Sequence, residues 1–269
     1  MRTLQVLLVG MVLAGSGFAE KLSVLQDKPW LGCFAGHEGR GFDFAVGGDG
    51  KSEIHFKKGR TRISVFAAFP VTYILEEEIN GKWISRQIRE DGFETRDKPS
   101  DEPEKITYRV TYTGDTKVEI THEFEKGEVI IGAKIVEKTT ENKIRCGVRV
   151  VVPDLYRGIK EDGLSARDLK RKVDAEVAGE TLKDEKVKAD LHKKPKLDGP
   201  DYFADGAKHI SFEADAIAGR ELLLSTVDET AGRIEVEQSK DAYHGFSLFW
   251  WPDPEKTGTP GARLRMEVK

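Results

Sequence analysis

Short segments that favour β-strands, each closed by a turn signal, follow one another from Phe42 to Val152, and this succession constrains the fold more than any other feature of the chain. The segments are rich in Val, Ile, Thr, Tyr and Phe. Apolar and polar residues alternate in them with a period of two, which is typical of antiparallel strands. We predict nine strands in this region. They span residues 42–46, 52–56, 61–69, 71–78, 82–90, 105–113, 116–124, 128–138 and 143–152.

Four dipeptides between these segments predict tight reversals of the chain. Asp49-Gly50 and Asn80-Gly81 are favoured in type I′ turns, because both central residues of such turns adopt positive φ. Gly114-Asp115 and Lys126-Gly127 mark similar reversals. We therefore expect consecutive strands to pair as β-hairpins.

The pattern changes between residues 154 and 199, where charged residues of both signs dominate. Leu169, Val173 and Val177 are spaced by four, which predicts a helix at about 166–178, and Thr181 can cap a second short helix. We expect a charged helical insertion at about 159–196 that lies over a face or an edge of the sheet. Strand patterns then resume in five segments, at residues 208–214, 221–226, 233–237, 245–250 and 263–268.

Together these features predict a mainly β protein of about fourteen strands. No alternation of strands and helices supports a parallel sheet. The expected architecture is a large antiparallel β-sandwich with one charged helical insertion, built as one continuous structure or as two sandwiches that share an interface. We favour a single domain over residues 20–269, because the five C-terminal strands would form an independent sheet only marginally.

The first residues have the order of a secretory signal, with Arg2, an apolar stretch from Leu4 to Ala14, and small residues that end at Ala19. This stretch is shorter than the roughly 20 residues needed to cross a bilayer. We predict a signal peptide over residues 1–19, export to the periplasm or the extracellular space, and no membrane insertion after cleavage. An apolar N-terminal strand is the alternative. The net charge of −4 gives no electrostatic reason to expect nucleic acid as a partner.

The chain contains two cysteines, Cys33 and Cys146. An oxidising compartment would permit a disulfide between them, which would close a loop of about 114 residues. Two separate buried thiols are the alternative. We expect no metal site from these cysteines, because their spacing without an adjacent His does not fit one, and we expect no cofactor.

The most distinctive local segment lies near the C-terminus and includes Tyr243, His244, Trp250 and Trp251. In a strand the two tryptophans point to opposite faces, so one indole can lie outside the main core. An aromatic ring beside polar groups can stack on the apolar face of a sugar while the sugar hydroxyls form hydrogen bonds. We take Trp251, Tyr243, His244 and Arg40 as candidate ligand-binding residues. Burial of both indoles is the alternative.

Two loops could carry catalytic groups. A glycine-rich loop contains His37, Glu38 and Arg40, and it could place a general base beside a guanidinium that orients a substrate. An Asp-rich loop contains Asp201 and precedes His209, and its carboxylates could also bind calcium. His37, Glu38, Asp201 and His209 are therefore candidate acid, base or sugar-binding groups. Both loops also have the composition of ordinary solvated turns.

Three functions fit these observations. We favour a non-catalytic binding module for a glycan or another extracytoplasmic ligand. The alternatives are a structural or interaction protein whose helical insertion contacts an extracytoplasmic protein, and a carbohydrate-active enzyme of the sandwich type. The sequence contains no P-loop and no G-x-S-x-G motif, but catalytic residues can converge from distant strands, so an enzyme stays open.

Overall fold

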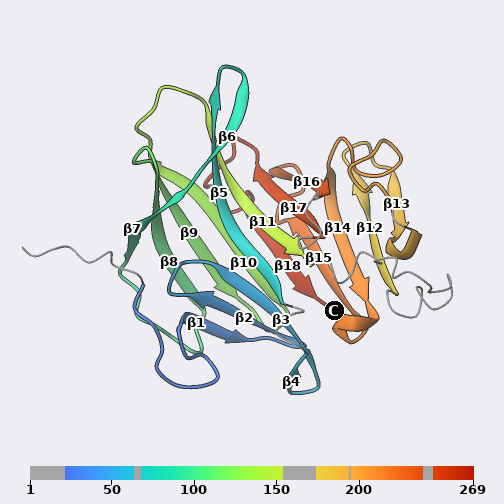
Figure 1. Ribbon diagram of the computed structural model, residues 1–269, viewed down its shortest axis with the longest axis horizontal. Coiled ribbons are helices and arrows are strands. Elements are labelled where there is room, and N and C mark those ends of the chain that lie inside the picture. The colour runs from blue at the N-terminus through green and yellow to red at the C-terminus, as the bar shows by residue number, and fades with distance from the viewer. Residues whose placement is uncertain (1–21, 64–67, 154–173, 194, 239–244) are drawn as a thin grey trace, which may run out of the picture.

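The computed structural model describes residues 22–63, 68–153, 174–193, 195–238 and 245–269, in which β-strands predominate (Figure 1). The strands up to residue 152 are β1 (Cys33–Glu38), β2 (Phe42–Gly47), β3 (Ser52–Lys58), β4 (Thr61–Arg62), β5 (Phe69–Ile79), β6 (Lys82–Arg86), β7 (Ile88–Thr95), β8 (Lys105–Tyr112), β9 (Lys117–Phe124), β10 (Glu128–Glu137) and β11 (Ile144–Val152). The later strands are β12 (Ala175–Thr181), β13 (Lys186–Asp190), β14 (Ala207–Ala214), β15 (Arg220–Thr226), β16 (Gly232–Gln238), β17 (Phe246–Pro252) and β18 (Leu264–Val268). The predicted signal peptide at residues 1–19 lies outside the described residues.

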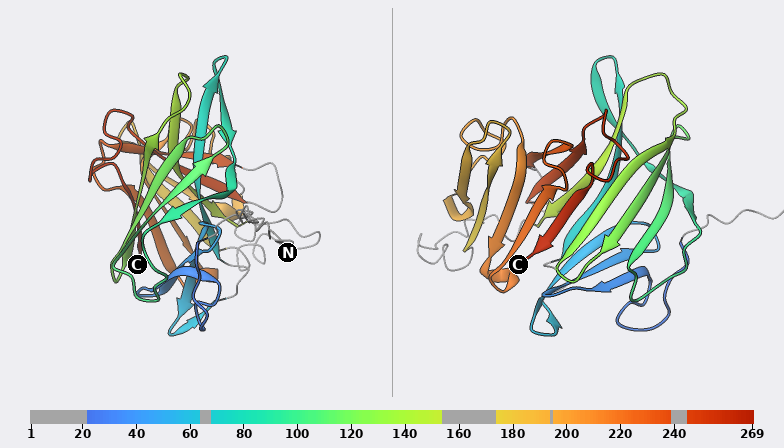
Figure 2. Two further views of the ribbon diagram at one scale, coloured as in Figure 1. Left: turned by 90° about the vertical axis from the view of Figure 1, so that its left-hand side faces the viewer. Right: turned by 180° about the vertical axis from the view of Figure 1, so that it is seen from behind.

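Neighbouring strands pair antiparallel and form two long runs. The first run is β1-β2-β3-β5-β11-β17-β16, and the short strands β4 and β6 pair with β3 and β5. The second run is β7-β8-β9-β10-β18-β15-β14-β12-β13. One pairing, between Ala207 of β14 and Ile234 of β16, connects the runs into a large curled antiparallel sheet (Figure 2). The mainly β antiparallel fold is thus confirmed, and the division into the two separate sheets of a sandwich is not.

The core lies between the inward faces of the two runs. Buried residues from both runs form a single hydrophobic cluster that includes Phe44, Tyr108, Phe212 and Trp250. In β8 the predicted alternation is confirmed, because every second residue from Ile106 to Tyr112 is buried in this cluster. The outward faces of the strands carry the polar side chains, so these faces are where a solvent-accessible binding site is expected.

All four predicted reversals connect antiparallel strand pairs, but Asp49-Gly50 is not a type I′ turn, because Gly50 has a φ of 71° and Asp49 does not have a positive φ. Asn80 and Gly81, between β5 and β6, have φ values of 52° and 74°, and Gly114 and Asp115, between β8 and β9, also have positive φ. Figure 1 shows the β5–β6 hairpin projecting beyond the neighbouring strands. It reaches beyond the pairing of β5 with β11, which ends at Glu77 and Ile144.

The predicted helical insertion is wrong in the part that the structure describes. Residues expected in helices form β12 and β13, and the described residues contain helix only as two 3-10 turns, η3 (Leu191–Lys193) and η4 (Asp215–Ile217). Val177 of β12 is fully buried opposite Phe212 of β14, so burial against a neighbouring strand overrides the local pattern. The rest of the predicted insertion, at residues 159–173 and 194, lies outside the described residues.

The predicted disulfide is also absent, because Cys33 and Cys146 are both free thiols. Cys33 begins β1 and Cys146 lies in β11, four steps away in the first run. At roughly 4.8 Å per step, the path along the sheet is about three times the Cα separation of a disulfide. Cys146 is buried, and desolvation raises the pKa of its thiol to about 12.

Candidate functional site

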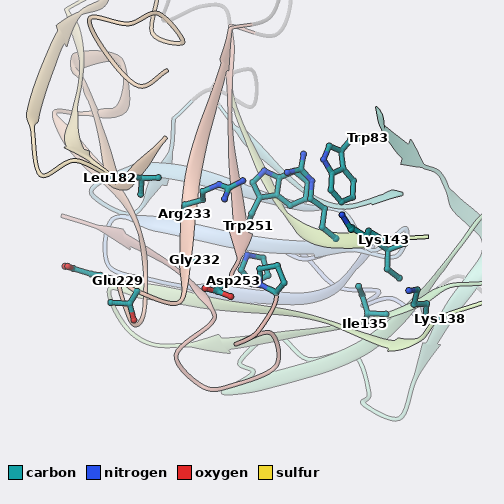
Figure 3. Close-up of a pocket in the computed structure, with 15 residues that line it drawn as sticks. Trp83, Ile135, Lys138, Lys143, Leu182, Glu229, Gly232, Arg233, Trp251 and Asp253 are labelled. Atoms are coloured by element: carbon teal, nitrogen blue, oxygen red, sulfur yellow. The ribbon is translucent and has the colours of Figure 1, made fainter. Parts of the chain in front are cut away.

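A groove of about 790 Å³ lies on the outward side of the first run, where the ends of several strands meet (Figure 3). Its wall combines aromatic, apolar and charged side chains. They come from β6, β10, β11, β16 and β17 and from the loops between strands: Trp83, Ile135, Lys138, Lys143, Ile144, Arg145, Leu182, Glu229, Thr230, Gly232, Arg233, Trp251, Pro252, Asp253 and Pro254. This volume is in the range of small-molecule sites, roughly 300 to 1,000 Å³.

The pairing register brings the central groups of the groove together. Arg145 of β11 pairs with Glu76 of β5, and Trp251 of β17 pairs with Arg233 of β16. Gly147 lies two residues after Arg145 on β11. A Cβ atom at this position would lie 2.7 Å from the Trp251 ring and 2.3 Å from the Trp250 carbonyl oxygen. A glycine at this position therefore allows the Trp251 indole to lie against the sheet.

Arg145 lies between two indole rings. Its guanidinium carbon is 3.9 Å from the centroid of the Trp251 ring and 4.6 Å from that of Trp83. Its Nε donates to Glu76 Oε2 over 2.8 Å, and a second guanidinium nitrogen lies 2.6 Å from the same oxygen. Each cation–π contact contributes about 0.5 to 2 kcal/mol, and more where water is excluded. The two rings and the Glu76 carboxylate therefore hold the guanidinium from three sides.

The two tryptophans differ in what they offer to a ligand. Trp83 is 41% exposed, whereas Trp251 is 4% exposed and forms the floor of the groove. The Trp251 ring stacks on Phe249 at a centroid distance of 6.2 Å, and its Nε1 donates to Glu235 Oε2 over 3.0 Å. The open aromatic surface of the groove is therefore the ring of Trp83.

The charged residues of the groove are unevenly paired. Arg233 forms a 2.8 Å ion pair with Glu235, and Lys143 lies 3.4 Å from a Glu78 oxygen. Lys138 directly follows β10 and has no ion-pair partner among the described residues. The groove thus contains, besides the exposed Trp83 indole, an ammonium group with no ion-pair partner among the described residues.

Of the predicted ligand-binding residues, the structure places Trp251 in the groove and Arg40 elsewhere. Arg40 is exposed in the turn between β1 and β2, where its backbone N–H donates to the Lys126 carbonyl over 2.6 Å. Tyr243 and His244 lie outside the described residues. Both indoles are buried, as the alternative expected, with Trp250 in the main core and Trp251 facing outward beneath Arg145 and Phe249.

The predicted catalytic groups near the first turn have structural partners. His37 Nε2 donates to the Glu125 carbonyl over 2.9 Å, and its ring stacks on Phe124 at 5.1 Å. Desolvation lowers the pKa of His37. Glu38 accepts a 3.0 Å hydrogen bond from Lys57, which also lies 2.6 Å from Asp43. This cluster ties the β1–β2 hairpin to β3 and to the β9–β10 turn.

Asp201 and His209 lie apart from His37 and Glu38. Asp201 is exposed in a turn, and His209 lies on β14 in the wall of a second hollow of about 670 Å³, with Ser211 and Ser225. Within the described parts of the chain, no hydrogen bond joins His209 to a carboxylate or a hydroxyl. The four predicted catalytic residues therefore do not form one site.

Another polar cluster is sealed in the core. Tyr73 and His122 form a 2.5 Å hydrogen bond between the phenol oxygen and Nε2, and Ser52 Oγ lies 2.9 Å from the same phenol oxygen. His122 is fully buried, which lowers its pKa to about 3, so the imidazole is neutral. Its Nδ1 has no hydrogen-bond partner in the part of the chain that the structure describes.

Neither a metal site nor a membrane-spanning helix is found in the parts of the chain that the structure describes. No group of three or more His, Cys, Asp or Glu side chains in these ranges could hold a metal ion. The Asp-rich loop with Asp201 therefore gains no support as a calcium site. The same residues contain no helix long and apolar enough to cross a bilayer.

The comparisons with known proteins include a distant structural similarity. No family model and no curated protein matches the chain. Among solved structures, the chain is similar to a GH31 family sulfoquinovosidase from E. rectale in complex with an aza-sugar inhibitor, with 10% sequence identity and a TM-score of 0.29. The match covers 81% of this chain and 31% of that one, so this chain spans about a third of the enzyme's length. A similarity of this size identifies neither a family nor an activity.

The sequence alone did not single out Trp83 or Arg145. Trp83 follows the Asn80-Gly81 turn in a predicted strand, and alternation places it on one face with Ser85. Arg145 and Arg149 lie on one face of the strand at 143–152 by the same alternation. Their meeting depends on which strands are neighbours, and the local pattern does not contain that information.

Proposed function

We propose that the protein is an exported, non-catalytic binding module that holds a saccharide in the groove of Trp83, Arg145 and Trp251. The observation that carries the proposal is the 41% exposed Trp83 ring, stacked on a fixed guanidinium at the side of a groove of about 790 Å³. An indole face of this kind suits the apolar face of a sugar ring, and planar polar groups beside it suit the sugar hydroxyls.

The surroundings of Trp83 support a preformed site. The Arg145 guanidinium is fixed by Trp251 and Glu76, so little side-chain freedom is lost when a ligand contacts it. Asp253 and Glu229 supply hydrogen-bond acceptors in the wall. Leu182 adds an exposed apolar surface.

The two other functions have less support. The interaction hypothesis relied on a helical insertion, but its described part forms the strands β12 and β13. The enzyme hypothesis relied on His37, Glu38, Asp201 and His209, which lie at different places on the sheet and outside the groove. The binding hypothesis keeps Trp251 as part of the site and adds Trp83.

The proposal is tested by titrating the chain from Glu20 with cello-, xylo-, manno- and galacturono-oligosaccharides and recording calorimetric heats and Trp fluorescence. We expect at least one series to bind and to raise the melting temperature by mass action. Trp83→Ala should weaken that binding about 10- to 100-fold, since burying and stacking an aromatic ring is worth roughly 1.5 to 3 kcal/mol.

Ile84→Ala is the matched control. Ile84 is the next residue of β6 and is 44% exposed, but it points to the opposite face of the hairpin and does not line the groove. We expect wild-type affinity in this variant. The proposal is wrong if no oligosaccharide binds the folded protein, or if the two variants lose affinity equally.

A further inference from the structure

The side of the groove next to Trp83 is cationic. Figure 3 shows Lys138 and Lys143 near Trp83 and Ile135, whereas Glu229 lies on the other side, beyond Trp251. An adjoining hollow of about 270 Å³ shares Ile135, Ile144 and Arg145 with the groove and adds Lys134. Three lysines and one arginine therefore gather where the groove and the hollow meet.

These cations are incompletely neutralised by the protein. Glu76 binds Arg145, Glu78 lies near Lys143, and Asp253 lines the wall, so four cations face three carboxylates. Lys134 and Lys138 have no ion-pair partner among the described residues, and Lys143 is 82% exposed. The Arg145 guanidinium uses two of its three nitrogens on Glu76, which leaves the third with no acceptor in the described chain.

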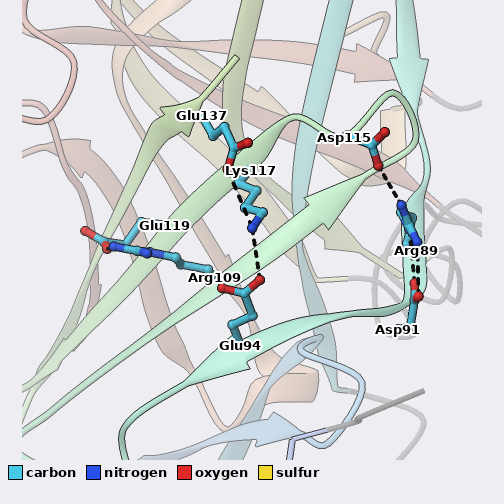
Figure 4. A network of polar contacts seen from close by, with 8 residues as sticks. All are labelled: Arg89, Asp91, Glu94, Arg109, Asp115, Lys117, Glu119 and Glu137. Atoms are coloured by element: carbon cyan, nitrogen blue, oxygen red, sulfur yellow. Dashed lines mark hydrogen bonds and ion pairs between the residues drawn. The ribbon is translucent and has the colours of Figure 1, made fainter. Parts of the chain in front are cut away.

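A patch on the outward face of β7 to β9 shows the contrast. There Arg89, Arg109 and Lys117 each pair with a carboxylate (Figure 4). Lys117 lies between Glu94 at 3.1 Å and Glu137 at 3.5 Å, and Arg109 bonds Glu119 over 3.2 Å. The cations of this patch are thus neutralised by the protein, whereas Lys134 and Lys138 beside the groove have no ion-pair partner among the described residues.

From these charges we infer that the groove selects a saccharide carrying a carboxylate or sulfate group, and that this group lies at Lys138, Lys143 and Arg145 while the sugar ring lies on Trp83. The inference rests on the proposed function. Arg145 supplies the geometry, because a guanidinium held in one plane suits the planar oxygens of a carboxylate. The lysines supply charge, and hydrogen bonds to charged groups are roughly twice as strong as neutral ones.

Two matched ligand pairs test the inference. One is an oligogalacturonate and its methyl ester, and the other is a chondroitin sulfate oligosaccharide and its desulfated form. We expect the more highly charged member of at least one pair to bind at least 10-fold more tightly than its partner at 50 mM salt. The preference should shrink at 300 mM salt, because exposed charges are screened.

Two variants locate the charge effect. Lys138→Glu reverses an exposed charge in the groove and should reduce the preference for the acidic member about fivefold or more, with an unchanged melting temperature. Lys82→Glu, on β6 but outside the groove lining, is the control and should keep the preference. Equal changes in the two variants would indicate a general field effect and would overturn the inference.

The remaining outcomes separate the inference from the proposed function. If a neutral oligosaccharide binds through Trp83 and neither acidic member binds better than its partner, the inference is wrong and the proposed function stands. If no saccharide binds, both are wrong. Binding of an acidic member that is insensitive to salt and to Lys138→Glu also overturns the inference.

Discussion

The buried cluster around His122, called the inner cluster, and the outward-facing contacts of Arg145, called the outer stack, share one arrangement. They differ in solvent exposure and in charge. In the core, the His122 ring lies between Tyr108 at 5.8 Å and Phe124 at 5.9 Å, and the three rings are nearly parallel. On the outward face, the Arg145 guanidinium lies between Trp83 and Trp251. Each place therefore puts a planar polar group between two aromatic rings.

Burial makes the difference between the two places. His122 is fully buried and has no charged partner among the described residues, so desolvation lowers its pKa and it stays neutral. Arg145 keeps 23% of its side chain exposed and keeps its charge beside Glu76. The inner cluster is therefore sealed in the core, whereas the outer stack presents a charged and partly exposed surface, where we propose that a saccharide binds.

Among the changes that distinguish the two regions, His122→Ala should have the largest effect on the free energy of unfolding. Removing a buried ring leaves a cavity between Tyr108 and Phe124, and such changes cost about 3 to 5 kcal/mol. We expect this loss in the free energy of unfolding, measured in urea, and unchanged saccharide affinity in the folded variant. A large loss of affinity would show that the two regions are coupled.

The second effect is a pH dependence of stability that belongs to the inner cluster. The pKa of His122 is about 3 in the folded protein, below the roughly 6.5 of an unfolded chain, so the unfolded state binds an additional proton between these values. Stability should therefore fall as the pH falls below 6.5, by about 2 kcal/mol between pH 7 and pH 5.

The measurement compares urea unfolding of the wild type and His122→Gln at pH 7 and pH 5. Glutamine does not titrate, so the variant should lose less stability than the wild type over this interval, and other groups cancel in the difference. The same pH dependence in both proteins would mean that the pKa of His122 does not differ between the folded and unfolded states, contrary to this prediction.

Most strands could be predicted because apolar and polar residues alternate along them with a period of two. The segment of β8 shows this, since its alternate residues from Ile106 to Tyr112 are buried as the pattern indicates. The prediction of a helix around Val177 failed because a spacing of four fits both a helical face and a strand with a period of two. Pairing of β12 with β14 decided between them.

The site was predictable only in part, for a related reason. Alternation correctly separated Trp250, in the inner core, from Trp251, on the outward face. The contact of Arg145 with Trp83 needs β5 to pair with β6 on one side and with β11 on the other. Such long-range neighbours follow from the packing of the whole sheet, which no local pattern records.

The smallest effect that we expect comes from Arg145→Lys, which keeps the charge and removes the planar group. A lysine cannot stack between Trp83 and Trp251 as a guanidinium does, and it offers Glu76 a single bond. Because the outer stack is open to water, we expect a loss of only about 1 kcal/mol in stability. Affinity for the saccharide should fall about threefold to tenfold.

Calorimetric titration of the Arg145→Lys variant gives its affinity for the saccharide, and urea unfolding of the same sample gives its free energy of unfolding. Ile84→Ala, in the same hairpin but outside the groove, provides the reference for a change of similar exposure. If Arg145→Lys destabilised the protein as much as His122→Ala and left binding intact, the outer stack would be a structural element like the inner cluster. The proposed division between a sealed core and an open site would then fail, because both planar groups would serve only the fold.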